Sequence, residues 1–252
     1  NSPHFFLSSV ICIIVLMCEY AQALPPYPMY MSLRVGTPSD PLRLAVMISG
    51  NGSGMKALLE YTEHKKACCH CTVIVLSDRY EAKGLSIAEE YGIFSLGIPL
   101  PEGNLDPISR RLMHEESLQS KLIENNVEAI ILSGYMRILT PNFVSKWEGK
   151  ILNIHPSLLP KFPGAHAHRD VLSSRETESG CTVHFVDSGM DTGAIIEQST
   201  VPVFPNDTIE SLQKRVKIEE HRLYPRIIDD FSEGKIRLIN GKIINLEDHV
   251  DN

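Results

Sequence analysis

Two polar side chains stand two positions apart in an otherwise apolar segment, Lys150-Ile-Leu-Asn-Ile-His155. The segment predicts a short buried strand, which Pro156 ends because proline cannot donate to a sheet ladder. On a strand, Asn153 and His155 point to the same side. An amide N–H can stabilise a developing negative charge, and an imidazole can carry a proton near neutral pH. Alone, a histidine at a strand end is more often structural, and such an asparagine more often caps a turn.

A glycine-rich turn, Gly50-Asn-Gly-Ser-Gly54, follows an apolar run at 43–49 and precedes a segment of helical spacing at 55–61. This order favours binding of an anion, because bare backbone N–H groups and the helix dipole face it. The turn lacks the Lys-Ser/Thr of a Walker loop, and Met55 stands where a dinucleotide motif has its third glycine. It therefore fits a phosphate on a small ligand better than a nucleotide; the alternative is a plain tight turn.

Strand and helix signals alternate from residue 43 to residue 155, which favours a doubly wound, mostly parallel α/β sheet. The expected strands lie at 43–49, 71–77, 93–96, 127–133 and 150–155, and the helices at 55–61, 82–91, 108–125 and from 141. Beyond Pro160 we expect a helix at 169–174, antiparallel strands at 181–186 and 194–204, a helix at 208–231 capped by Asp207, and a hairpin at 236–244.

The composition is that of one globular domain with a tail, at 252 residues, 43% hydrophobic. A net charge of −7 and the lack of a basic stripe argue against nucleic-acid binding. The apolar stretch from Phe5 to Met17 is short for a membrane span and, with Ala21 and Ala23, is similar to a signal-peptide core and cleavage site. The alternative is a leftover or mispredicted leader, with translation starting at Met29 or Met31.

We therefore expect residues 1–41 to be a leader and linker outside the fold, and residues 42–252 to form the domain, without stable membrane anchoring. The expected location is cytoplasmic, with organellar or secretory targeting left open by the truncated leader. Six cysteines do not form an evident disulfide framework. The cluster Cys68-Cys69-His70-Cys71 is too tightly spaced for one segment to wrap a tetrahedral metal, so no metal is expected.

From Asn153 to Pro160, Asn-Ile-His-Pro-Ser-Leu-Leu-Pro, the chain resembles the phosphoribosylglycinamide formyltransferases, folate-dependent enzymes of purine synthesis. The resemblance covers residues 42 to 240, and its motifs occur in order at the spacing of the family. The further motifs are Ile48-Ser-Gly-Asn-Gly-Ser53, Gly134-Tyr-Met-Arg-Ile-Leu139, Val183-His-Phe-Val186 with Asp191 and Gly193, Val201-Pro-Val-Phe204, and Glu220-His221 before Tyr224-Pro225.

The resemblance implies a Rossmann-like domain that transfers the formyl group of 10-formyltetrahydrofolate to the amine of N1-(5-phospho-D-ribosyl)glycinamide, in de novo purine biosynthesis. By matching positions, the catalytic residues are Asn153, His155 and Asp191. The implied contacts to the ribonucleotide are Gly52, Ser53, Gly54, Lys217, Ile218, Glu219 and Glu220. The implied folate contacts are Arg111, Met136, Arg137, Ile138, Leu139, Asn153, Asp187 and Asp191.

The sequence departs from the family pattern at several positions. Gly54 stands where the family usually has Asn, and Lys217 replaces a common Gln. Arg111 lies in a poorly matching helix, and Arg110 is the alternative folate contact. Among the histidines near these motifs, we expect His184 to be a packed core residue close to the site, and His166 and His168 to be surface or loop residues.

In the implied acyl transfer, Asn153 donates to the oxyanion, His155 stabilises charge and moves a proton, and Asp191 favours and orients the charged imidazole. Other enzymes use the same domain, namely formyltetrahydrofolate hydrolase, with an added N-terminal regulatory domain, and methionyl-tRNA formyltransferase, with a C-terminal barrel. A non-catalytic module that binds folate or phosphate is a further alternative. The expected partners are small-molecule substrates, and the chain is expected to be a monomer or homodimer.

Overall fold

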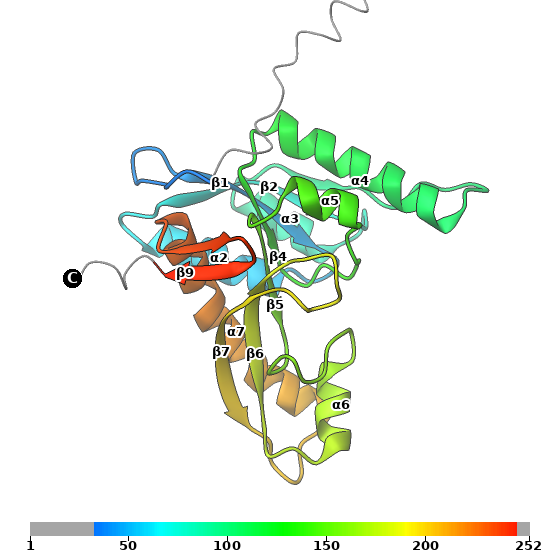
Figure 1. The fold of residues 1–252 in the computed structure, drawn as a ribbon, viewed down its shortest axis with the longest axis vertical. Helices are drawn as coiled ribbons and strands as arrows, with labels where there is room; N and C mark the ends of the chain where they lie inside the picture. The colour runs from blue at the N-terminus through cyan, green and yellow to red at the C-terminus, as the bar shows by residue number, and fades with distance from the viewer. Residues whose placement is uncertain (1–32, 246–252) are drawn as a thin grey trace, which may run out of the picture. The chain divides into compact units, whose positions relative to one another are not determined.

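A seven-stranded sheet forms the centre of the computed structural model, which describes residues 33–245 (Figure 1). Its strand order is β3-β2-β1-β4-β5-β6-β7. The parallel strands are β1 (Leu42–Ile48), β2 (His70–Ser77), β3 (Ser95–Gly97), β4 (Ala129–Leu132) and β5 (Ile151–His155). The antiparallel strands are β6 (Glu178–Phe185) and β7 (Ile195–Pro202). The predicted mostly parallel sheet with an antiparallel C-terminal part is therefore confirmed.

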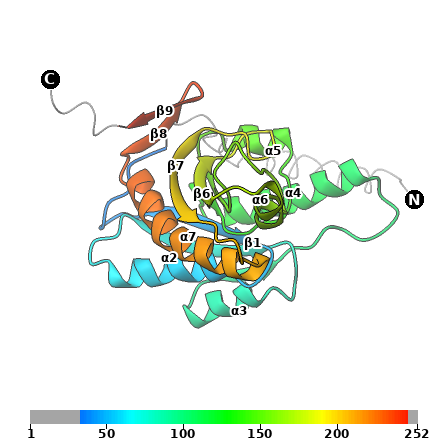
Figure 2. The same ribbon diagram turned by 90° about the horizontal axis from the view of Figure 1, so that it is seen from below.

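Helices cover both faces of the sheet (Figure 2). On one face, α2 (Ser53–His64), α3 (Lys83–Glu90) and α7 (Ile209–Ser232) share a buried apolar cluster with β1. On the other face, α4 (Pro107–Glu124) and α5 (Pro141–Lys146) pack in a second apolar cluster. Side chains alternate between the two clusters along β1, because successive residues of a strand point to opposite faces. The short helix α6 (Ala167–Ser174) packs against α7.

Most predicted elements are present, and their ends differ from the prediction by a few residues. Asp106 caps α4 through the backbone N–H groups of Ile108 and Ser109, with Pro107 at the first position. The predicted cap of α7 is wrong: Thr208 caps it. Asp207 instead pairs with Arg215 at 2.8 Å.

The predicted C-terminal hairpin is present as β8 (Ile236–Ile239) and β9 (Lys242–Asn245). Asn240 and Gly241, between the strands, have φ angles of 51° and 73°. Two successive positive φ angles are typical of the tight turns that match the twist of a hairpin, and Asn-Gly is a favoured pair for them.

Part of the predicted linker contacts the domain. Leu33 packs against the apolar cluster under β1. Arg34 makes two hydrogen bonds to the carboxylate of Glu128, with distances of 2.5 and 2.7 Å. The backbone N–H of Gly36 donates to the carbonyl of Ser232 at 2.8 Å. Residues 33–41 therefore belong with the fold, whereas the predicted apolar leader and both candidate start methionines lie outside the described residues.

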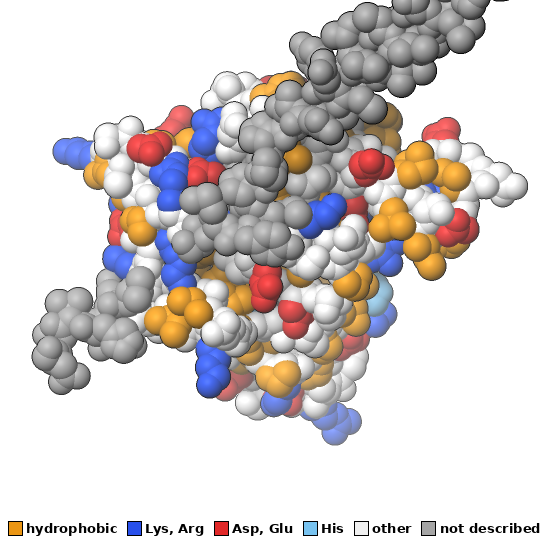
Figure 3. All heavy atoms as spheres, turned by 45° about the horizontal axis from the view of Figure 1, so that its top comes forward, with side chains coloured by type: hydrophobic (Ala, Val, Ile, Leu, Met, Phe, Trp, Pro, Cys, Tyr) orange, Lys and Arg blue, Asp and Glu red, His pale blue; other side chains and the backbone are white. Residues whose placement is uncertain are grey.

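The surface gives further information on the expected partners. Within residues 33–245, no helix combines the length and the apolar character that crossing a membrane requires. On the face in Figure 3, the basic and acidic side chains of the described residues are interspersed, without a stripe of a single charge.

The strand order determines where a ligand site is expected. Strand β1 lies between β2 and β4. After β1 the chain adds β2 and β3 on one side of it, and then crosses to add β4 and β5 on the other side. In open α/β sheets, the crevice at such a switch point is the usual binding site.

Candidate active site

A cavity of about 630 Å³ lies at the carboxyl ends of β1, β4 and β5. Its lining combines four stretches of the chain that are far apart in sequence: the glycine-rich turn, the loop after β4, the end of β5 and one face of α7. The loop between β6 and β7 completes it with Asp187 and Asp191. The cavity therefore brings together most of the residues that the sequence indicates.

At one end of the cavity, the glycine-rich turn leads into the N-terminus of α2. Gly52 has a φ angle of 67°, and a Cβ there would lie 2.7 Å from Cα of Gly84. A Cβ on Gly54 would lie 2.6 Å from the hydroxyl of Ser133. Gly52 thus allows a close backbone approach that other residues would block, whereas at Gly54 the neighbour is the end of the Ser133 side chain. No side chain caps α2, so its first N–H groups face the cavity end, as an anion site requires.

One face of α7 forms the neighbouring wall. Its side chains in the cavity are those of Gln213, Lys217, Glu220 and Tyr224. These positions are spaced by three or four residues, which places them on one side of a helix. The resemblance implies contacts for all of Lys217 to Glu220, but Ile218 is 62% exposed and is not among the lining residues. Glu219 is also outside the lining and accepts hydrogen bonds from Ser199 and Arg222.

Burial shifts the pKa of two cavity-lining groups, one on α7 and one on α6. Burial raises the pKa of Glu220 to about 7, and the positive charge of Lys217 opposes that rise. Burial also lowers the pKa of His168, which lines the cavity from α6. The prediction that His168 is a surface or loop residue is therefore wrong, whereas His166 is exposed at the start of α6.

His155, at the end of β5, is 5% exposed and is held from both sides. Its Nε2 donates to the carbonyl of Phe162 at 2.8 Å. Its Nδ1 lies 3.3 Å from Oδ2 of Asp191. Both ring nitrogens therefore face oxygen acceptors, an arrangement that an imidazolium satisfies fully because both of its nitrogens are donors.

Asn153 faces a different histidine. Its amide nitrogen lies 3.1 Å from Nε2 of His184, the residue opposite it on β6. Nδ1 of His184 donates to the carbonyl of Phe185 at 2.8 Å, so Nε2 is the acceptor. His184 is 2% exposed, and burial lowers its pKa, which favours the neutral ring. The structure thus places His184 inside the site as a partner of Asn153.

Asp191 reaches the site because the loop between β6 and β7 folds back over the sheet. The φ angle of Asp191 is 55°, a left-handed conformation that aspartate adopts more readily than most residues. The backbone N–H of Gly164 donates to its Oδ2 at 2.8 Å. Asp187 organises the same loop by accepting hydrogen bonds from Gly189 and Thr192. The predicted trio is therefore assembled around one end of β5.

The loop after β4 forms another part of the cavity lining. The hydroxyl of Ser49 accepts a hydrogen bond from the backbone N–H of Met136 at 2.8 Å, which fastens the loop to the end of β1. Arg137 forms an ion pair of 2.7 Å with Asp78, which is 3% exposed. Met136 and Ile138 are 65% and 55% exposed and present apolar surface in this part of the lining.

Of the two candidate arginines on α4, only Arg111 contacts this loop. Its guanidinium donates to the carbonyl of Ile138 at 2.7 Å, and it lines a smaller adjoining pocket of about 290 Å³ with Met136 to Leu139. Arg110 instead donates to the carbonyl of Gly103.

Sequence reasoning missed several residues of the cavity lining. These are Arg79, Gly164, His168, Gln213 and Tyr224. The helical spacing of Gln213 and Tyr224 from Lys217 and Glu220 is a signal that could have identified two of them. Tyr224 also donates toward the carbonyls of Leu132 and Leu152, at 3.0 and 2.9 Å, and so links α7 to the ends of β4 and β5.

A Rossmann-like sheet that presents an amide, an imidazole and a carboxylate beside an uncapped helix N-terminus is the arrangement of a group-transfer enzyme acting on small molecules. The family model of the formyl transferases matches residues 42–228, and the chain belongs to that family. It is 38% identical over 199 residues to the phosphoribosylglycinamide formyltransferase of Escherichia coli, a match that covers 78% of this chain and 90% of that protein.

Two other relatives extend the comparison. A glycinamide ribonucleotide transformylase from Symbiobacterium toebii superposes with a TM-score of 0.74 at 37% identity, covering 82% of this chain and 94% of that one. The trifunctional purine biosynthetic protein adenosine-3 of Chironomus tentans is 47% identical over 197 residues, which are 78% of this chain. The chain spans only 14% of the length of that trifunctional protein.

Proposed function

We propose that this chain transfers the formyl group of 10-formyltetrahydrofolate to the amine of N1-(5-phospho-D-ribosyl)glycinamide. The observation that carries the proposal is that Asn153, His155 and Asp191 line one cavity together with the uncapped N-terminus of α2 and the exposed apolar side chains of the loop after β4. Membership of the formyl transferase family and the names of its relatives support the same reaction.

Two parts of the cavity lining suit the two substrates. The open N-terminus of α2 and the side chain of Lys217 favour a phosphate, with Glu220 within the same wall to meet hydroxyl or amine groups. The exposed apolar side chains of Met136 and Ile138 favour a flat heterocycle, which is the pterin in this proposal. The formyl group and the amine would then meet at the end of β5.

In the reaction, the amine nitrogen bonds to the formyl carbon, and the carbonyl electrons move to oxygen. The second N–H of Asn153, which His184 does not take, donates to that oxyanion, and a charged His155 stabilises it further. When the intermediate collapses, the C=O re-forms and the bond from carbon to the folate nitrogen breaks. The former amine loses a proton and the folate nitrogen gains one, with His155 and Asp191 carrying the exchange.

The test incubates the purified chain with 10-formyltetrahydrofolate, with and without the ribonucleotide, and measures tetrahydrofolate and the formylated product. We expect both products only when the ribonucleotide is present. Tetrahydrofolate and formate without the ribonucleotide would instead identify a hydrolase. Tight binding of the folate without turnover in either reaction would identify a binding module. Either of these two results would overturn the proposal.

A further inference from the structure

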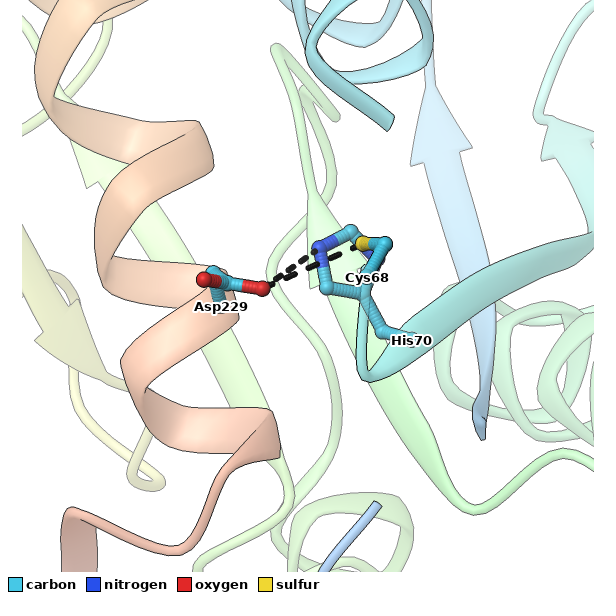
Figure 4. A group of neighbouring side chains, drawn as sticks. All are labelled: Cys68, His70 and Asp229. Atoms are coloured by element: carbon cyan, nitrogen blue, oxygen red, sulfur yellow. Dashed lines mark hydrogen bonds and ion pairs between the residues drawn. The ribbon is translucent and has the colours of Figure 1, made fainter. Parts of the chain in front are cut away.

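A second cluster of reactive side chains lies outside the cavity, where the start of β2 approaches the last turns of α7. Cys68 and His70 come from the first segment and Asp229 from the second (Figure 4). Their ligand atoms all lie within 4.8 Å of one another. None of the three residues lines the cavity, so the proposed reaction does not use them.

His70 is the unusual member of the cluster. It is 1% exposed, and neither of its ring nitrogens has a hydrogen-bond partner. A buried polar group without a partner is costly, so native structures rarely keep one without a reason. Its Nε2 points toward Asp229 and lies 3.9 Å from Oδ1, too far for a hydrogen bond (Figure 4).

The spacing of the ligand atoms leaves room for a cation between them. The thiol of Cys68 makes only a long hydrogen bond to Oδ1 of Asp229, with 3.9 Å between Sγ and Oδ1. Around a tetrahedral Zn²⁺, with bonds of roughly 2.0–2.3 Å, neighbouring ligand atoms are about 3.4–3.6 Å apart. The two pairs that share Oδ1 of Asp229 need to contract by only a few tenths of an ångström to reach that spacing, and Sγ of Cys68 and Nε2 of His70 must approach from within 4.8 Å.

The neighbours of Asp229 leave the required oxygen available. Its other oxygen, Oδ2, accepts hydrogen bonds from the ammonium of Lys65 and the hydroxyl of Tyr61. Oδ1 is thereby turned toward Cys68 and His70, in the way that outer partners orient metal ligands. Lys65 also lies 3.4 Å from Glu233, which moderates the positive charge beside the cluster.

We propose that Sγ of Cys68, Nε2 of His70 and Oδ1 of Asp229 bind Zn²⁺ or a similar divalent cation, with water as the fourth ligand. Sulfur and imidazole ligands are typical of zinc rather than of magnesium or calcium. Binding would release the thiol proton of Cys68 to solvent, so that the thiolate and Asp229 balance the two positive charges. The site would join β2 to α7. The sequence argument against a metal counted ligands within one segment, whereas the fold adds Asp229 from another.

The first test is a titration with Co²⁺, a spectroscopic substitute for Zn²⁺, on the full chain carrying Cys12→Ser and Cys18→Ser. These two replacements remove the thiols of residues 1–32 from the signal. We expect one equivalent of Co²⁺ to give a thiolate charge-transfer band and the visible spectrum of a tetrahedral site. Cys68→Ser removes the band, whereas Cys71→Ser, a change at another half-buried thiol nearby, keeps it. Absence of the band, its survival in Cys68→Ser, or equal loss in both variants overturns the proposal.

A second test needs no change in the cluster, so a failure to fold cannot obscure it. The unsubstituted chain is alkylated with iodoacetamide at increasing free Zn²⁺, and fragment-ion mass spectrometry follows each cysteine. At a free Zn²⁺ concentration ten times the dissociation constant, labelling of Cys68 slows about tenfold while labelling of Cys71 is unchanged. No change at Cys68, or the same slowing at Cys71, contradicts the site.

Discussion

The side-chain amide of Asn153 donates a hydrogen bond to Nε2 of His184, across the antiparallel pair of β5 and β6, over 3.1 Å. The acceptor is available because Nδ1–H of His184 is held by the carbonyl of Phe185. This bond determines which end of the amide faces the histidine, and therefore where the remaining N–H points. His184 thus acts as a positioning residue for the proposed oxyanion donor.

Replacement of His184 by Ala should lower kcat roughly ten- to a hundredfold and leave KM for both substrates nearly unchanged, because Asn153 loses the partner that aims its amide and Asp191 loses a neighbour at 3.7 Å. His184→Gln should recover part of the rate, since its amide oxygen can accept the same hydrogen bond. Steady-state kinetics with both substrates measures the split. A matched control is His64→Ala, an exposed histidine on α2 that bonds only its own helix. A rate loss in the control, or a raised KM without a change in kcat for His184→Ala, would contradict the positioning role.

Removal of the amide itself should have a larger effect. Asn153→Ala should lower kcat by about 10²–10³, or ~2.7–4 kcal/mol of barrier, as is usual for one oxyanion donor. The melting temperature should stay close to that of the parent protein, because the side chain is only half-buried at the cavity wall. Single-turnover rates with saturating substrates measure the loss. An Asn153→Ala variant with an unchanged single-turnover rate would exclude Asn153 as the donor.

Asp191 and Asp187 lie in one loop, but replacing each of them should change the kinetics in a different way. Asp191→Asn keeps an acceptor for the N–H of Gly164 but removes the charge beside His155, so kcat should fall by about a hundredfold or more. Asp187→Asn weakens only the hydrogen bonds to Gly189 and Thr192, so its main effect should be on KM for the folate. The kcat and KM of both variants, measured over a range of pH, test this difference. Equal kinetic changes in the two variants would show that Asp191 acts only through the loop.

Glu220 should make stability depend on pH. Its pKa is raised to about 7 in the folded chain, against about 4.3 in an unfolded one. Between these values the folded state holds a proton that the unfolded state has lost, so stability is full below pH 4 and falls as pH rises through 7. The variant Glu220→Gln lacks this titrating group. The free energy of unfolding of the parent protein, minus that of the variant, should therefore fall by ~1–3 kcal/mol from pH 5 to pH 8. Urea unfolding at several pH values measures it, and a constant difference would disprove the shift.

The ion pair of Arg137 with the buried Asp78 should hold in place the loop after β4, which is the proposed contact for the folate. Asp78→Asn keeps the shape but removes the charge, so KM for 10-formyltetrahydrofolate should rise several-fold while KM for the ribonucleotide stays the same. Asp40→Asn, at an exposed ion pair with Arg34, is the matched control and should change neither. If both substrates lose affinity equally, the pair supports the fold in general and not the loop.

The parts of the site that could be predicted are those encoded locally. The strand of Asn153 and His155 can be predicted because an apolar run ends at Pro156. The glycine-rich turn can be predicted because its glycines lie between a strand signal and a helix signal. For the wall on α7, the sequence predicts the whole segment 217–220 and does not tell which of its side chains face the cavity. Ile218 and Glu219 differ from their neighbours by the rotation of the helix about its axis, which depends on packing against the sheet.

Other features depend on contacts between distant segments. The place of His184 follows from the register of β6 on β5, and that register is not visible in either strand alone. The same holds for residues 33–41, whose polar and proline-containing sequence is typical of a linker until Glu128 and Ser232 provide partners for it. The approach of Asp229 to His70 likewise requires α7 to be folded against the start of β2.

The packing of α2 against α7 has a consequence for how the protein is made. The glycine-rich turn lies at the start of α2, but Lys217 and Glu220 are on the last long helix. As a nascent chain leaves the ribosome from its N-terminus, β5 and β6 can pair while α7 is still inside the exit tunnel. The proposed catalytic strand can therefore form before the substrate wall exists. A chain whose synthesis stops before α7 would carry Asn153, His155 and Asp191 but would lack the wall that Lys217 and Glu220 form.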